Sequence, residues 1–415
     1  MDDNIKLGYE DITLVPKTVS DIVSRRDYDY LRQLMMKNSV KLGYEDITLV
    51  PETVSNIVSR QDCDYLDECF RLPIFTAPMD TVISYENYNV FIKNGIHPII
   101  PRTATLLEKL DILINKLEFV AISLSEAEDI FLKKHNNKNE ITNFRTALLR
   151  KKNSCKICID VANGHMKHLL SLIKDIKDKY GEQVIVMSGN IANPKTYNEY
   201  ENVGCDYVRC SIGSGSRCTT ASNTAIFHPQ FSLLKEIWET KQKINGKCKI
   251  IADGGIKGYR DIQKALIYAD YVMIGNLFNR AIESAGKTVY GKAYFKIFGK
   301  KFINPFKTFL IYGKTVKPKK YYKVLQDIKN GKIDVWKEFY GMSTKIAQER
   351  IKGNKQKLKT SEGIVKKQKV EYSLTQWVEN EIDYLRSAMS YTNSKNLSEY
   401  QNSQWVRISY RSYND

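Results

Sequence analysis

Eight short apolar runs recur between residues 72 and 275, and most are separated by stretches with helical spacing. The runs are LPIFTA (72–77), GIHPII (95–100), FVAIS (119–123), KICIDVA (156–162), QVIVMSG (183–189), DYVRCSI (206–212), CKIIADGG (248–255) and DYVMIG (270–275). They are nearly continuous in apolar residues, which is typical of parallel strands buried on both faces. Eight such units predict a (β/α)₈ TIM barrel, and an open doubly wound sheet is the structural alternative.

An internal repeat precedes the first of these runs. Residues 5–31 recur almost unchanged at 40–66. Because a stacked array needs at least three copies, we interpret the pair as a tandem duplication. We therefore predict a duplicated N-terminal arm at 1–39 and the barrel at 40–415, with a basic insertion at about 287–336 after the eighth strand.

Composition restricts the class of protein. The 415 residues carry a formal net charge of +17, and eight cysteines are present. Without a signal peptide or an apolar run long enough to span a membrane, we expect a cytoplasmic chain that makes no membrane contact and has no disulfide framework. We read the basic excess as a solvated surface, so a nucleic-acid partner is expected to be unlikely.

Polar residues follow the predicted strands, where barrel enzymes place their catalytic loops. The loop SIGSGSRCTT (211–220) is the most distinctive, because its glycines allow backbone amides or carbonyls to turn toward a phosphate or a monovalent cation. Cys218 in this loop is a candidate nucleophile, although a buried structural cysteine is an equal alternative. Asp253 precedes two glycines, a combination suited to a sugar diol and its phosphate but also to a plain turn.

The loop SIGSGSRCTT resembles the catalytic loop of the IMP dehydrogenase/GMP reductase family. Further blocks occur in the family's order, namely LGYEDITLVP…SR, APMDTV, CIDVANGH, MSGNI, IIADGGI, VMIGN and FYGMS. Four blocks are closer to the reductase: CIDVANGHMKHL, FYGMSTKIA, LKTSEG and LRSAMSYTN. APMDTV is closer to the dehydrogenase. The resemblance thus implies GMP reductase activity, with two alternatives: an IMP dehydrogenase, or a catalytically silent, basic, nucleic-acid-binding relative.

The resemblance also implies roles for individual residues. The catalytic residues would be Cys218, which attacks purine C2, and the proton relay of Thr220 and Glu362. GMP would be bound by Ser216, Asp253, Gly254, Gly255, Gly275, Asn276, Gly341, Met342, Ser343, Lys359 and Gly363. The last few of these belong to a catalytic flap at about 340–370.

The implied cofactor is NADPH, with a potassium ion beside the catalytic loop. The dinucleotide would contact Ser59, Arg60, Asp160, Val161, Ala162, Ile212 and Gly213, together with Ser387 and Ser390 from a neighbouring subunit of a homotetramer. Potassium would be bound by carbonyls of Gly213, Gly215 and Cys218. Pro98 stands where the reductase has a lysine near the cofactor.

Overall fold

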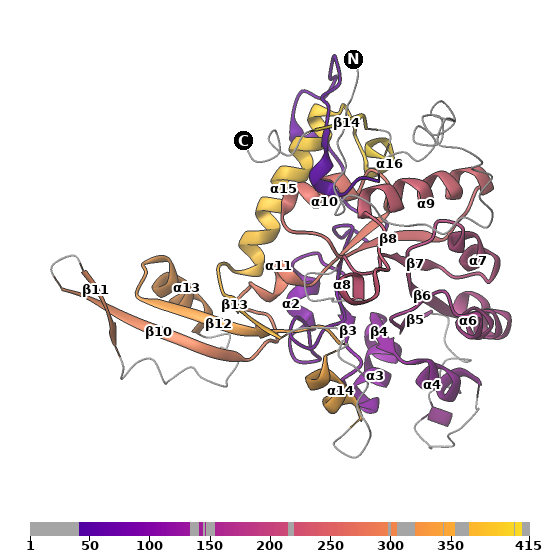
Figure 1. Ribbon diagram of the computed structural model, residues 1–415, viewed down its shortest axis with the longest axis horizontal. Coiled ribbons are helices and arrows are strands. Elements are labelled where there is room, and N and C mark those ends of the chain that lie inside the picture. Colours follow the sequence, from indigo (N-terminus) through magenta and orange to yellow (C-terminus); the bar gives the residue numbers. More distant parts are fainter. Residues whose placement is uncertain are drawn as a thin grey trace, which may run out of the picture.

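The computed structural model describes residues 41–132, 141–143, 146, 154–214, 220–297, 300–304, 320–342, 344–352, 365–401 and 403–408. Eight parallel strands form its central sheet, in the order β2-β9-β8-β7-β6-β5-β4-β3 (Figure 1). A parallel bridge between Phe75 and His97 joins β2 to the residues before β3. The ring of strands is therefore nearly closed, and the expected (β/α)₈ barrel is confirmed.

Each barrel strand lies within one of the eight apolar runs or overlaps it. The strands are β2 (Ile74–Thr76), β3 (Ile99–Ile100), β4 (Phe119–Ile122), β5 (Cys155–Asp160), β6 (Val184–Ile191), β7 (Tyr207–Cys210), β8 (Lys249–Asp253) and β9 (Tyr271–Ile274). Several are shorter than their apolar runs, because the first residues of a run form the turn that enters the strand.

Alternate residues of the strands face two different cores, which explains the continuous apolar runs. In β4, Phe119 and Ala121 belong to the cluster inside the barrel, whereas Val120 and Ile122 pack toward the helices. The ring of Phe75 lies 5.5 Å from that of Phe119 and 5.0 Å from that of Tyr271. The interior is therefore filled, and chemistry is confined to the mouth of the barrel.

Helices cover the outside of the barrel. Those after the successive strands are α2 (Tyr88–Lys93), α3 (Leu106–Asp111), α4 (Leu124–Ala127), α6 (Lys167–Tyr180), α7 (Thr196–Asn202), α8 (Thr220–Thr224), α9 (Gln230–Ile244), α10 (Tyr259–Ala265) and α11 (Asn276–Asn279). In α6, Leu169, Leu172, Ile173 and Ile176 are buried at the three- and four-residue spacing of one helix face. No helix in the described part of the chain is long and apolar enough to cross a membrane.

The second copy of the repeat is built into the fold. Its β1 (Ile47–Leu49) pairs antiparallel with β14 (Trp405–Arg407) near the C-terminus. The short helix η3 (Arg60–Asp62) packs beside α15 (Leu374–Tyr391), an amphipathic helix near the C-terminus. The segment 41–66 is therefore held at both ends by the C-terminal region, whereas residues 1–40 lie outside the described residues.

The basic insertion forms most of a second sheet that extends from the barrel (Figure 1). Its antiparallel strands are β10 (Thr288–Ile297), β11 (Lys300–Asn304), β12 (Ile333–Phe339) and β13 (Lys366–Lys369), in the order β11-β10-β12-β13. Helix α13 (Tyr321–Lys329) packs on β12 around Val335. The expected insertion boundary at 336 falls within β12, so the insertion and the predicted flap share one sheet.

A buried lysine fastens this second sheet to the barrel. Lys337 of β12 is fully buried, and its ammonium donates hydrogen bonds to the carbonyls of Ile282 and Ser284, both at 2.7 Å. Burial lowers the pKa of Lys337 to about 7. Asn279 adds a second connection, since its amide donates to the carbonyls of Thr81 at 2.7 Å and Glu338 at 3.0 Å.

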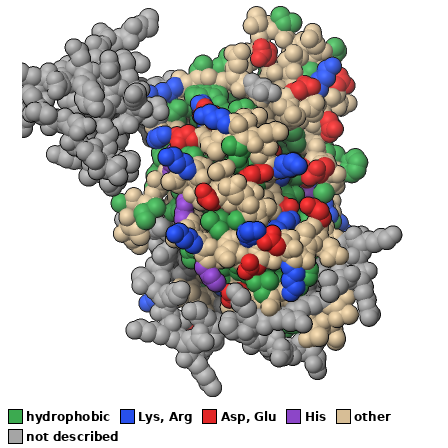
Figure 2. All heavy atoms as spheres, turned by 90° about the vertical axis from the view of Figure 1, so that its right-hand side faces the viewer, with side chains coloured by type: hydrophobic (Ala, Val, Ile, Leu, Met, Phe, Trp, Pro, Cys, Tyr) green, Lys and Arg blue, Asp and Glu red, His purple; other side chains and the backbone are tan. Residues whose placement is uncertain are grey.

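Two features of the composition, the charged residues and the Cys-x-x-Cys spacing, can be followed in the structure. Figure 2 shows acidic and basic side chains interspersed over the side of the barrel that lies to the right in Figure 1. Cys155 and Cys158 are both buried, but they belong to the outer and the inner core respectively. Burial raises the pKa of each thiol to about 12. The Cys-x-x-Cys spacing is therefore structural.

Candidate functional site

Three charged residues meet where β5, β7 and β8 end. Arg209 of β7 donates one hydrogen bond to Asp160 Oδ1 at 2.6 Å and two to Asp253 Oδ2, at 3.0 Å from Nε and 2.8 Å from Nη2. Asn190 of β6 donates to the same oxygen of Asp253 at 2.6 Å. Because these strands are parallel and adjacent, the network fixes Asp160 and Asp253 at one edge of the barrel mouth.

Burial makes this network electrostatically strong. The Arg209 side chain is only 9% exposed, and those of Asp160 and Asp253 are 13% and 14% exposed. Burial alone would lower the pKa of Arg209, but Asp253, Cys158 and Asp160 together raise it well above its ordinary value. The guanidinium therefore stays charged and holds both carboxylates in fixed orientations.

The loops after β7 and β8 lie side by side. Ser214 donates a long hydrogen bond of 3.5 Å to the carbonyl of Asp253, and its hydroxyl also contacts that of Ser211. A Cβ added to Gly255 would lie 3.7 Å from the Ser214 side chain. The first residues of the predicted catalytic loop thus adjoin the Asp253-Gly254-Gly255 turn.

Glycine is required at several positions of these loops. Gly213, Gly254 and Gly255 have φ values of +79°, +95° and +77°, which L side chains rarely adopt. At Gly213 an added Cβ would also lie 2.7 Å from the Cβ of Ala221 at the start of α8. The backbone is therefore free of side chains where the resemblance expects phosphate and cation contacts.

The loop after β9 meets the loop after β2. A Cβ at Gly275 would lie 2.9 Å from the sulfur of Met79, so the Met79 side chain packs directly on the backbone of Gly275. Asn276 begins α11, and its backbone carbonyl accepts a hydrogen bond of 3.4 Å from Gln368 of β13. The predicted substrate residues 275 and 276 therefore lie beside the second sheet.

The segment after β12 returns to the barrel mouth. Tyr340 donates to Asp80 Oδ2 at 3.3 Å, and Arg350 of α14 (Lys345–Lys352) donates to the same oxygen at 2.9 Å. Thr81 donates to the carbonyl of Tyr340 at 3.3 Å. These contacts hold Gly341 and Met342, two of the predicted substrate residues, near the loop that follows β2. The contacts themselves were not predicted from the sequence.

The predicted cofactor residues fall into two groups. Asp160 ends β5 and Val161 and Ala162 follow it, while Ile212 and Gly213 follow β7, all at the barrel mouth. The other group lies at α15, where Arg60 donates to the Ser387 hydroxyl at 3.3 Å and Ser55 donates to the Ser390 carbonyl at 2.8 Å. Ser59 caps the short helix that Arg60 begins. The fold therefore brings Ser59, Arg60, Ser387 and Ser390 together, separately from Asp160.

Several predicted residues lie outside the described part of the chain. They are Gly215, Ser216, Cys218, Ser343, Lys359, Glu362 and Gly363. Thr220 begins α8, and only its backbone is described. Their roles remain predictions that rest on the sequence.

Two arginines of the site were not predicted from the sequence. Arg209 had a visible signal, because it is a cation within the apolar run DYVRCSI. Arg102 follows β3 and donates a long hydrogen bond of 3.5 Å to the Asp160 carbonyl, while its buried Nε has no partner. Only the proximity of the β3 and β5 ends in space could reveal its place beside the predicted cofactor residues. Pro98, by contrast, is buried just before β3.

A metal site of acidic, histidine or cysteine side chains is absent from the residues with described placement. A cation bound by backbone carbonyls is a different kind of site. Gly213, whose left-handed backbone is described above, is the member of the predicted potassium set that the structure describes.

Comparison with known proteins agrees with the motif order. Residues 41–307 match the family model of the IMP dehydrogenase / GMP reductase domain. The chain is 28% identical over 402 residues to a GMP reductase of Onchocerca volvulus, covering 95% of this chain and 88% of that protein. It is 27% identical over 302 residues to human GMP reductase 2, covering 72% of this chain and 76% of that protein. It is 25% identical over 412 residues to a GMP reductase of Buchnera aphidicola, covering 99% of this chain and 96% of that protein.

Proposed function

Because the chain belongs to the IMP dehydrogenase/GMP reductase family, we propose that it is a GMP reductase, which converts GMP to IMP and ammonia with NADPH. The observation that carries this proposal is the turn formed by Asp253, Gly254 and Gly255. There, a fixed carboxylate precedes two glycines in left-handed conformations beside the loop of the predicted nucleophile. Relatives named GMP reductase, at 25–28% identity over most of the chain, support the choice of activity.

In this proposal, the nucleotide is held mainly by backbone and by Asp253. The contacts from Arg209 and Asn190 all reach Oδ2 of Asp253, so Oδ1 is directed to the ribose hydroxyls. Amides of Gly254, Gly255, Gly275 and Asn276, with the hydroxyl of Ser216, bind the phosphate. Gly341, Met342 and Ser343 bind the base, and Lys359 and Gly363 close over it.

The proposed chemistry begins with the thiolate of Cys218, which attacks C2 of GMP and forms a C–S bond. Thr220 and Glu362 deliver a proton to the 2-amino group, so that it leaves as ammonia. When bound, NADPH supplies the hydride that C2 accepts. The C–S bond then breaks, its electron pair returns to sulfur, and IMP is released from the regenerated thiolate.

At the barrel mouth, one described residue suits a bound dinucleotide, and another differs from the residue that the reductase carries. Pro98 removes the cation that the reductase carries before β3, whereas Arg102, a few residues later, has an unpaired Nε beside Asp160, Val161 and Ala162. We propose that Arg102 supplies the missing positive charge for the cofactor. Replacing it with Gln should raise the KM for NADPH more than the KM for GMP.

The remaining parts of the proposal concern assembly, the cation and location. Ser387 and Ser390 would contact a cofactor bound in the neighbouring subunit of a homotetramer. Because Ser59 and Arg60 lie beside these serines and apart from Asp160, we extend this proposal to them. Carbonyls of Gly213, Gly215 and Cys218 would bind potassium and stabilise the catalytic loop. A cytoplasmic location also remains a prediction.

The alternative is an IMP dehydrogenase, which the APMDTV block favours. We would measure NADPH consumption with GMP, and NADH formation from IMP and NAD, using the full chain and its Cys218→Ala variant. The proposal expects the first activity alone, with its loss in the variant. NADH formation from IMP without NADPH consumption would contradict it.

A further inference from the structure

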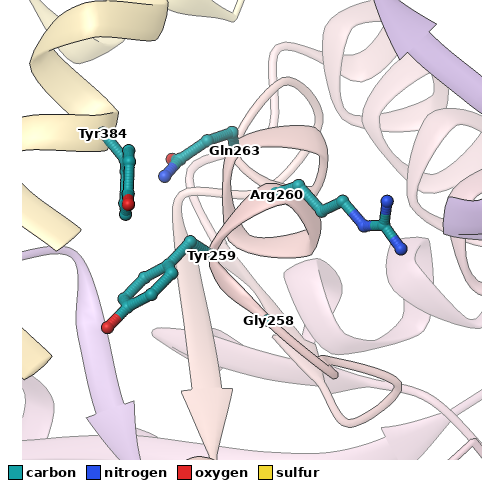
Figure 3. A pocket seen from close by; sticks show the side chains of 5 residues that line it. All are labelled: Gly258, Tyr259, Arg260, Gln263 and Tyr384. Atoms are coloured by element: carbon teal, nitrogen blue, oxygen red, sulfur yellow. The ribbon is translucent and has the colours of Figure 1, made fainter. Parts of the chain in front are cut away.

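A second hollow lies on the outside of the barrel, between α10 and α15. It has a volume of about 490 Å³ and is lined by Gly258, Tyr259, Arg260, Gln263 and Tyr384 (Figure 3). This volume is within the range of small-molecule sites. None of these five residues has a role in the reaction proposed above.

A buried amide in this hollow lacks a full set of partners. Gln263 is only 7% exposed, and its Nε2 donates to Oε1 of Glu381 at 3.1 Å, while its Oε1 has no partner. Glu381 is fully buried, and burial raises its pKa well above the ordinary value. Oε2 of Glu381 has no partner either, so this buried pair leaves one polar atom unpaired on each side chain. Such an atom is unfavourable in a protein unless a ligand or water pairs with it.

Aromatic rings form one wall of the hollow. The ring of Tyr259 lies 4.9 Å from that of Tyr384 and is stacked on Trp377 at 5.4 Å. Tyr384 is 52% exposed, so a large apolar ring remains open to solvent beside Gln263. In Figure 3 the Gln263 side chain points toward Tyr384. A planar group placed on this ring would therefore reach the unpaired amide atom through its edge.

The other end of the hollow is cationic and open. Arg260 is exposed and extends away from the two tyrosines in Figure 3. Gly258 lies between these two ends in the same view, and a Cβ added there would meet no atom within 4 Å. The hollow thus combines a stacking ring, a hydrogen-bonding amide and an arginine, with no side chain separating them.

We propose that this hollow binds a purine nucleotide, as a site separate from the barrel mouth. The base stacks on Tyr384, its exocyclic amino group or a ring nitrogen pairs with Gln263, and the phosphate binds Arg260. An apolar ligand would leave Gln263 unpaired, and a free inorganic anion would leave the ring uncovered. A nucleotide satisfies all three features at once.

The test is calorimetric titration of the full chain with AMP, and with adenosine and ribose 5-phosphate as its two halves. Because AMP can also enter the nucleotide sites proposed at the mouth, Gly258→Leu, which fills the hollow, should lower the number of AMP molecules bound per chain by one. Gln263→Leu should weaken AMP and adenosine alike by about fivefold. Arg260→Ala should weaken AMP and ribose 5-phosphate but leave adenosine unchanged.

Controls separate this site from the proposed catalytic one and from misfolding. Tyr384→Ala, at an exposed position, should weaken AMP without changing the unfolding temperature. Tyr391→Ala, on the same helix but outside the hollow, should leave AMP binding and the unfolding temperature unchanged. GMP turnover by Gly258→Leu should equal that of the unmodified chain. The proposal is overturned by an unchanged number of AMP molecules bound per chain in Gly258→Leu, or by no binding at about 1 mM AMP, and either result leaves the reductase assay unaffected.

Discussion

Arg209 is the residue on which the geometry of the barrel mouth depends most. It is buried in β7 and joins Asp160 of β5 to Asp253 of β8, so two predicted site residues share one partner. A buried charge of this kind is costly to remove alone, because its former partners remain charged in a poorly solvated place.

Replacing Arg209 with Met should therefore lower the free energy of unfolding by about 3–5 kcal/mol and abolish turnover of GMP. Urea unfolding and the NADPH assay would measure the two effects. Arg209→Lys is the matched control, since it keeps the charge but cannot reach both carboxylates with a planar fork. A loss below about 1 kcal/mol in Arg209→Met would contradict the account.

A second buried pair, Asp67 and His97, predicts a pH dependence of stability. Asp67 Oδ2 lies 2.6 Å from His97 Nε2, and Tyr271 donates to the same oxygen at 3.1 Å. Burial raises the pKa of Asp67, but the hydrogen bond and charge of His97, with backbone amides of Arg71 and Cys69, outweigh it and lower the pKa below its usual 3.8.

Because the folded pKa is lowered, the Asp67 contribution is present above pH 3.8 and is lost as pH falls through the folded value. Unfolding measured between neutral pH and pH 3 should show this loss in the unmodified chain. Asp67→Asn should be less stable near neutral pH and should lose less stability on acidification. Parallel curves for the two proteins would show that Asp67 is not the titrating group.

At the scale of elements, the strands were predictable and the second sheet was not. Strands such as β4 can be recognised in the sequence because both of their faces are buried, so every residue is apolar. In β12 the burial alternates, and Lys337 is a charged residue at a fully buried position. Only the carbonyls of Ile282 and Ser284, distant in sequence, explain how it is tolerated there.

The connection between α14 and the barrel mouth gives a prediction at this scale. Arg350→Gln removes the ion pair to Asp80 and should shift the segment that carries Gly341 and Met342. We expect the KM for GMP to rise by about threefold to tenfold with a smaller change in kcat, as for the loss of one hydrogen bond to a charged group. Asp334→Asn is the control, because it breaks an ion pair to Lys369 in the same sheet without touching Tyr340. Equal effects of the two variants would argue against a positioning role.

At the scale of the whole molecule, the eight apolar runs predicted the barrel, and the order of motifs along the chain predicted the family. The polar residues that end the strands, such as Asp160 and Asp253, could be placed at one edge because parallel strands share a direction. Arg102 could not, since its role depends on which strands are neighbours. Nor could the hollow beside Tyr384, which requires two helices separated by more than a hundred residues.

The duplicated segment allows a further prediction at this scale. The second copy contributes β1 and the contact between Arg60 and Ser387. Deleting residues 1–39 should leave GMP turnover unchanged and the unfolding temperature within about 2 °C of the full chain. Deleting residues 1–62 should lower both the GMP turnover and the unfolding temperature. A matching loss in the shorter deletion would mean that the first copy is structural.

The central claim is covalent attack on a purine nucleotide by the loop between β7 and α8. The most direct measurement is mass spectrometry of the full chain incubated with GMP and digested, without NADPH so that the adduct cannot be reduced. The account predicts a nucleotide adduct on the peptide that contains Cys218, and its absence from Cys218→Ala. An unmodified Cys218 peptide, or the same adduct on another cysteine, would contradict it.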